Sequence, residues 1–166
     1  MRWDHLFDDL EGQLERELTA EEQDLGIEEE RLRLGRLSVR DRIAALHEAG
    51  HPIGLTLTTG ERLVADVDTL GRDWFSATVA EGAVRSARCL VPLASIASLV
   101  LAPGQVEPSL VPVRDARAEA SLSMRLGLPF VRRDLCRRRW ALDLVVRATT
   151  LHGTIDRVGR DHLDLA

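Results

Sequence analysis

Residues 47–51 of this sequence read His-Glu-Ala-Gly-His, the one string whose residue types and spacing are typical of metal chemistry. On an unbroken helix, two histidines four positions apart bind zinc, and the glutamate between them activates water. Gly50 weakens a helix, and Pro52 disfavours helical geometry at the residue before it. We therefore expect a helix that ends here and no metal at His47 and His51. A zinc-dependent hydrolase is the alternative interpretation.

A basic segment is the second candidate for a site. Residues 125–139 contain six arginines and a single acid, Asp134, for a local charge of +5. With Trp140 beside it, such a segment is suited to contacting phosphates and stacking on a base. If nucleic acid binds, we expect it along Arg132, Arg133, Arg137 and Arg138. The alternatives are a solvated helix face, or a partner for an acidic segment elsewhere in the chain.

The remaining sequence offers no catalytic constellation. It contains no glycine-rich phosphate loop and no nucleophile with a base at a recognisable spacing. Cys89 and Cys136 match no metal or redox spacing, so we expect buried thiols in a reducing cytosol. The N-terminus is acidic and has no apolar h-region, so we expect no signal peptide, and no apolar run approaches membrane-spanning length. The sequence predicts a cytoplasmic protein with no catalytic residues, no cofactor and no membrane partner.

An internal repeat organises the chain: residues 63–77 and 151–165 align without a gap at an offset of 88. Each copy alternates apolar and polar residues, breaks at Gly-Arg-Asp and resumes, which predicts a strand, a tight turn and a strand. We expect Gly71 and Gly159 to adopt positive φ angles. We expect Asp73 and Asp161 to bond to their own turn backbone, so these residues are interpreted as structural rather than catalytic.

Around the repeat, the sequence predicts four segments. Residues 1–36 form an acidic amphipathic helical arm, either one helix or a helical hairpin; residues 1–34 carry a net charge of −8, against +3 for the rest. Residues 37–101 form a helix capped by Ser38 and then five short strands. Residues 102–113 are a Pro-rich linker. Residues 114–166 form a second, truncated unit of a helix and strands.

A helix followed by five short strands in so few residues is the plan of a small closed barrel, so the predicted class is α+β. The turn at residues 70–73 and the closing Val-Pro-Leu-Ala-Ser-Ile of residues 91–96 resemble those of Sm-like and SH3-like barrels. Sm proteins hold a base with an Asn and an Arg-Gly. This chain has no Asn, and Pro92-Leu93 stands where Arg-Gly is expected, so no uridine pocket is carried over.

The two ends of the chain, residues 3–11 and 158–166, also resemble an uncharacterised family of actinobacterial proteins. That resemblance covers most of the chain and implies a fold and a bacterial cytosol.

The sequence therefore predicts a non-catalytic binding or scaffold protein whose partner is a protein or an RNA. Applying the repeat offset to residues 89–100 places their counterparts at about 177–188, beyond Ala166. The second unit then has an open strand edge, expected at residues 162–166, which recruits another strand. We expect an oligomer that associates through the N-terminal helix or through this edge. The first barrel or the arm are the other segments expected to close it.

Overall fold

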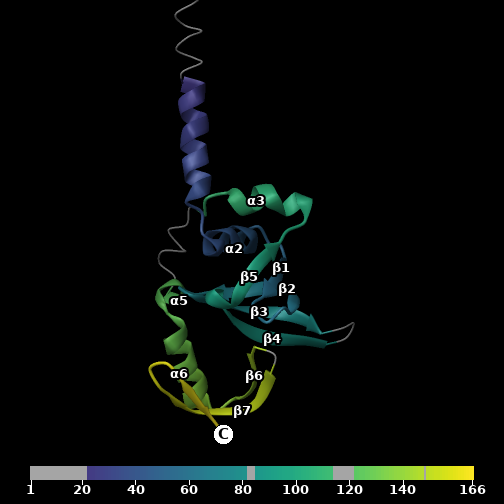
Figure 1. Cartoon of the computed structure of the whole chain (residues 1–166), viewed down its shortest axis with the longest axis vertical. Helices are drawn as coiled ribbons and strands as arrows, with labels where there is room; N and C mark the ends of the chain where they lie inside the picture. The colour runs from purple at the N-terminus through teal and green to yellow at the C-terminus, as the bar shows by residue number, and fades with distance from the viewer. Residues whose placement is uncertain (1–21, 82–84, 114–121, 148) are drawn as a thin grey trace, which may run out of the picture. The chain divides into compact units, whose positions relative to one another are not determined.

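The computed structural model of the chain describes residues 22–81, 85–113, 122–147 and 149–166 (Figure 1). The chain divides into two compact units, Met1–Leu37 and Ser38–Ala166. In the first unit, residues 22–35 form one helix, and its Leu25 and Ile27 side chains are exposed. The apolar stripe predicted for the start of the arm lies outside the described residues. No helix in the described part of the chain is both long enough and apolar enough to cross a bilayer.

The second unit begins with helix α2, Val39–Glu48. Its first turn is closed by a reciprocal cap: the Ser38 hydroxyl accepts from the Asp41 amide at 3.1 Å, and the Asp41 carboxylate accepts from the Ser38 amide at 2.9 Å. The helix ends before Gly50, which has a φ of +69°. Ile43 and Leu46 are fully buried against the sheet that follows.

That sheet is antiparallel and has five strands in the order β4-β3-β2-β1-β5. The strands are β1 (Ile53–Leu57), β2 (Arg62–Leu70), β3 (Trp74–Glu81), β4 (Arg85–Pro92) and β5 (Ile96–Val100), with a short 3-10 turn, η1 (Leu93–Ser95), before β5. Helix α2 lies across it (Figure 1), and the two share a core that includes Ile53, Leu55 and Phe75. The predicted α+β class is confirmed. Closure of this sheet into a barrel stays a prediction.

The Pro-rich segment after β5 is more ordered than the predicted linker. It forms a 3-10 turn, η2 (Pro103–Gln105), and a short helix, α3 (Val106–Leu110), which packs on α2. Arg42 on α2 donates to the Ser109 hydroxyl at 2.8 Å, and Ser109 is buried. The prolines fit because Pro103 and Pro108 lie in first turns, where a missing N–H breaks no helical bond.

The rest of the second unit contains a second, smaller sheet. Its elements are α5 (Leu122–Arg125), α6 (Leu128–Arg138), β6 (Ala141–Val146), β7 (Thr149–Val158) and β8 (Leu163–Leu165). The strands pair antiparallel in the order β6-β7-β8. Among the described residues from 122 onward, Leu128 and Ile155 are the buried apolar side chains. This small sheet is therefore much less covered than the first.

The pairing of β7 with β8 copies that of β2 with β3. Val158 pairs with Leu163, as Leu70 pairs with Phe75 88 residues earlier. The register shifts at the same point in both pairs of strands, next to Asp68 in the first and Asp156 in the second. The internal repeat therefore extends from the residue types to the strand register and to the irregularity within it.

Strand β6 pairs with β7 as β1 pairs with β2. Each residue of β6 lies 89 positions after its counterpart in β1, and each residue of β7 lies 88 positions after its counterpart in β2. Leu142 faces Gly153, as Ile53 faces Ala65. The two offsets differ by one because the second hairpin loop is one residue shorter. Two residues separate the paired Val146 and Thr149. Three residues separate Leu57 from Glu61, whose carbonyl accepts from the Leu57 amide at 2.8 Å. Elements α6, β6, β7 and β8 thus repeat α2, β1, β2 and β3 in order.

Candidate functional site

The structure separates the two histidines of the possible zinc motif. His47 lies in the last turn of α2, and the helix ends at the next residue, Glu48. His51 lies beyond the helix, and its amide donates to the Leu46 carbonyl at 2.9 Å. The two side chains therefore do not share the continuous helix that a two-histidine zinc site requires. Within the described ranges, no three or more His, Cys, Asp or Glu side chains are grouped so as to hold a metal ion.

The two Gly-Arg-Asp turns have the same local geometry, but the predicted reason for the glycine is wrong. Gly71 and Gly159 do not have positive φ angles. Instead, a Cβ on Gly71 would lie 2.3 Å from the Trp74 ring, and a Cβ on Gly159 would lie 2.3 Å from the His162 ring. An aromatic ring three residues later covers each glycine, so only the absence of a side chain permits the contact.

The first turn, residues 71–74, binds the start of helix α6. The Asp73 carboxylate accepts from the Leu128 amide at 2.7 Å, which differs from the predicted bond to its own turn. The Arg72 amide and the Trp74 indole both donate to the Leu126 carbonyl, at 3.1 and 3.0 Å. Gly127, the N-cap of α6, has no side chain to cap the helix. Asp73 therefore supplies this cap from a distant part of the sequence.

The second turn, residues 159–162, binds no such segment in the described part of the chain. Its Asp161 carboxylate contacts the neighbouring His162 ring at 2.9 Å, and the Asp161 side chain is 86% exposed. Gly159 donates to the His162 carbonyl at 3.0 Å, as Gly71 donates to Trp74 at 2.8 Å. The backbone of the turn is thus conserved between the copies, while its docking role is confined to the first.

Helix α6 does not bring the four candidate arginines onto one face. Arg133 and Arg137 are exposed one turn apart, beside the half-exposed Phe130. Arg132 is half-buried on another side of the helix. Arg138 donates to Asp134 at 2.7 Å and lies 5.3 Å from the centre of the Trp140 ring, so its charge is partly neutralised. The basic face is smaller than the sequence predicts.

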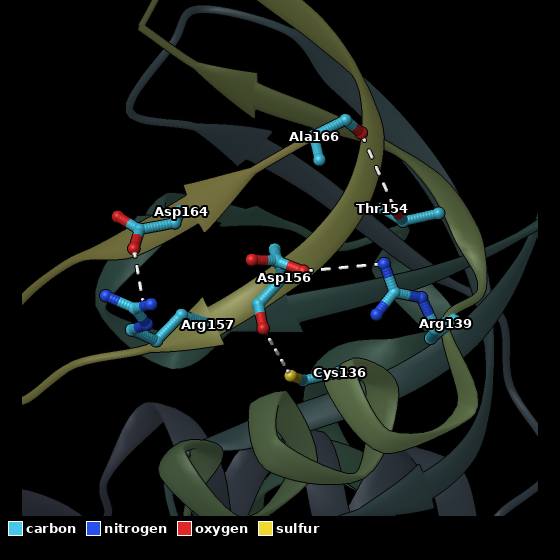
Figure 2. A network of polar contacts seen from close by, with 7 residues as sticks. All are labelled: Cys136, Arg139, Thr154, Asp156, Arg157, Asp164 and Ala166. Carbon is cyan, nitrogen blue, oxygen red and sulfur yellow. Dashed lines mark hydrogen bonds and ion pairs between the residues drawn. The ribbon is translucent and has the colours of Figure 1, made fainter.

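Polar contacts fix α6 and β8 on β7 (Figure 2). From the end of α6, the Cys136 thiol donates to the Asp156 carbonyl at 3.3 Å, and Arg139 pairs with the Asp156 carboxylate at 3.4 Å. Two residues before Asp156 on β7, the Thr154 carbonyl accepts from the Ala166 amide at 2.9 Å, so the last residues are paired on their β7 side. These contacts hold α6, β7 and β8 together as one small layer.

Both cysteines are free and half-buried, whereas the sequence predicted buried thiols. Cys89 lies on β4, where burial raises the pKa of its thiol. A raised pKa disfavours the thiolate, the reactive form of cysteine. Cys89 therefore has the environment of a structural thiol.

The unpaired edge that stands out in the structure belongs to β6. In the first copy, β1 is paired on both sides, with β2 and with β5. Its counterpart β6 is paired with β7 alone among the described residues. Val145 and Val146 on β6 are 48% and 47% exposed, and Trp140 just before it is 56% exposed. The sequence predicted an open edge at residues 162–166, where β8 is likewise paired with β7 alone among the described residues, but it missed the edge of β6. The alternation of residues 142–146 predicts a strand without indicating its neighbours.

No protein-family model, curated protein or solved structure matches this chain. The resemblances to Sm-like and SH3-like barrels and to an actinobacterial family therefore stay predictions. Among the described residues, the open edge of β6 and the exposed face of α6 are the surfaces with geometry suited to a partner.

Proposed function

We propose that this protein is a non-catalytic, cytoplasmic binding or scaffold protein, built on Sm-like or SH3-like units, that captures a protein strand on the open β6 edge. The observation that carries the proposal is the difference between the two copies of the repeat. In the first, β5 covers the outer edge of β1. In the second, the matching edge of β6 has no strand beside it in the described chain.

The small-barrel plan is supported by the order of the first sheet. The first strand pairs with both the second and the fifth, and a helix precedes it. Strands β4 and β5 stand at the two ends of this order, so bringing these ends together would close a five-stranded barrel. In the described chain, the second unit corresponds to the helix and the first three strands of such a barrel.

An edge with this composition favours a strand as its ligand. Unpaired N–H and C=O groups along a strand are a template for main-chain hydrogen bonds with another chain. The apolar side chains of β6 are only half-covered: Leu142 and Leu144 are partly buried, whereas Ile53 and Leu55 in the first copy are 0% and 1% exposed. An added strand would pair the backbone and shield these side chains together.

Photo-crosslinking tests this proposal directly. A photoreactive amino acid at Val145 is compared with the same group at Val64, which is 64% exposed but lies on the interior strand β2. In bacterial cells we expect an adduct from position 145 that protease removes and nuclease does not, and little adduct from position 64. A nuclease-sensitive adduct, or equal yields at both positions, would contradict capture of a protein strand.

Nucleic acid binding is the second candidate, and the exposed face of α6 favours it. Arg133 and Arg137 make no ion pair within the described residues, and Phe130, about one turn before Arg133 on the same face, offers a stacking surface. We expect weak, sequence-tolerant binding that falls with salt, and tighter binding when the acidic residues 1–34 are deleted.

Titration of labelled single-stranded RNA at two salt concentrations checks this second candidate. The double substitution Arg133→Gln and Arg137→Gln should reduce the salt slope by about 1.4, since each phosphate contact on a single strand contributes roughly 0.7. The control changes Arg62 and Arg88 to Gln, two exposed arginines of the first sheet. Salt-independent binding, or none even without residues 1–34, would remove this candidate.

The zinc hydrolase alternative has no geometric observation in its favour, because His51 lies beyond the end of α2. We expect no zinc after purification in the absence of chelators, measured by elemental analysis of the protein. One zinc per chain, lost on His47→Ala, would restore this alternative.

A further inference from the structure

The backbone groups that point to the open β6 edge can be identified from the first copy. The Leu57 amide donates to Glu61 on the β2 side, so the alternate residues Gly54 and Thr56 present their backbone groups to β5. At the offset of 89 between β1 and β6, their counterparts are Asp143 and Val145. These two residues therefore present the free donors and acceptors of the edge.

The first copy also indicates how a strand would lie there. Strand β5 runs antiparallel to β1. A second β6 supplies an antiparallel strand when two chains meet about a two-fold axis, and one contact then pairs the open β6 edges of both chains. Strand β6 suits this role, because its six residues contain no Gly or Pro and a single charge, Asp143. A foreign strand would cover only one such edge.

The side chains favour one of the two registers that are centred on the middle of β6. Residues opposite each other across an antiparallel pair share a face, so the partly buried Leu142 and Leu144 must oppose residues of their own face. Centring the axis on Asp143 would place two aspartates opposite each other, a like-charge pair. Centring it on Leu144 instead places Leu144 opposite Leu144, Leu142 opposite Val146, and Asp143 opposite Val145.

We propose that the strand captured by this edge is β6 of a second copy of this chain, in the register centred on Leu144. The contact joins the two small sheets into one antiparallel sheet of six strands. Its inner face brings together Leu142, Leu144 and Val146 from both chains, and its outer face pairs each Asp143 with a Val145. The inference rests on the proposed capture of a strand and adds the identity of the partner and the register.

A charge reversal at one position tests both the partner and the register. Val145→Asp places a carboxylate opposite Asp143 twice in each dimer, so we expect dimerisation about tenfold weaker than wild type. Val145→Lys places an amine opposite each Asp143, and we expect dimerisation as tight as wild type or tighter. Sedimentation equilibrium of the full chain over a concentration series measures both constants. Val64→Asp and Val64→Lys are the matched controls, with no effect expected on association.

A third variant separates the backbone contact from the charges. Val145→Pro removes the amide that faces the open edge, where proline is tolerated because no internal ladder bond is lost. We expect a folded monomer, with a circular dichroism spectrum like that of wild type.

The outcomes distinguish this inference from the proposed function. A wild-type chain that stays monomeric at every concentration overturns the inference, and so does equal weakening by Val145→Asp and Val145→Lys. If position 145 then crosslinks to a different protein, the proposed capture of a strand stands, and only the proposal that the strand comes from a second copy of this chain fails. If position 145 crosslinks to no protein, both proposals fail.

Discussion

The two copies of the repeat differ less in their own structure than in what surrounds them. Turn 71–74 and turn 159–162 share the same backbone hydrogen bond, and in each an aromatic ring three residues later covers the glycine. The first is covered by the start of α6, and the second is exposed. Local sequence thus determines the turn, whereas its use depends on which segment docks there.

Burial shows the same contrast. In the first copy, β4 and β5 flank the repeated strands and α2 covers them, so Phe75 and Ala77 are both 0% exposed. Their counterparts in the second copy, Leu163 and Leu165, are only half-buried, because no strand lies beyond β8 in the described chain. The first copy can therefore support the fold, while the second keeps surface available for binding.

The largest difference is expected for the matched core pair Phe75 and Leu163. Phe75→Ala should cost about 3–5 kcal/mol of unfolding free energy, because it leaves a cavity in a closed core. Leu163→Ala should cost about 1 kcal/mol, because its side chain is already half-exposed. Urea denaturation followed by circular dichroism measures both. Equal losses would mean that the second sheet is covered by something beyond the described contacts.

The glycine pair should give an intermediate difference. Gly71→Ala pushes a Cβ into the buried Trp74 ring, and we expect a loss of about 1–3 kcal/mol. In Gly159→Ala, the new Cβ contacts the exposed His162 ring, which can move aside, so we expect the unfolding free energy to fall by no more than about 0.5 kcal/mol. Thermal unfolding compares the two variants. A loss at Gly159 as large as that at Gly71 would show that its turn is held as tightly as the first.

The smallest difference is expected for the aspartate pair. Asp73→Ala removes the cap of α6 and should cost about 1 kcal/mol, with faster hydrogen exchange at the first amides of that helix. Asp161→Ala removes no contact with another element in the described chain, so stability should change little. Asp73→Asn keeps an acceptor and is the control. If Asp73→Ala leaves exchange in α6 unaltered, docking on the first turn is not what holds this helix.

Local signals in the sequence predicted the elements well. Ser38 begins α2, period-two alternation gives the strands, and the repeat reappears in the register of β7 with β8. The glycine was misread because its requirement comes from the ring three residues later. Both copies carry such a ring, Trp74 and His162, so the signal was present in the sequence.

The sequence alone did not predict contacts between residues that are far apart in the chain. Asp73 caps a helix that starts 55 residues later, and Arg42 orders the segment around Ser109 from 67 residues away. The open edge of β6 depends on which strands become neighbours, which alternation does not encode. These contacts decide where binding surfaces lie, so the candidate site needed the structure.

Hydrogen exchange at single-amide resolution tests most directly whether the outer edge of β6 is unpaired. The amides of Thr56 and Val145 hold matching positions in the two copies, one facing β5 and the other facing the open edge. We predict that Thr56 is protected at every protein concentration. Val145 should exchange rapidly in dilute protein and become protected as concentration rises. Protection of Val145 that is already complete at the lowest concentration would contradict an open edge, because a segment of the same chain would then cover it.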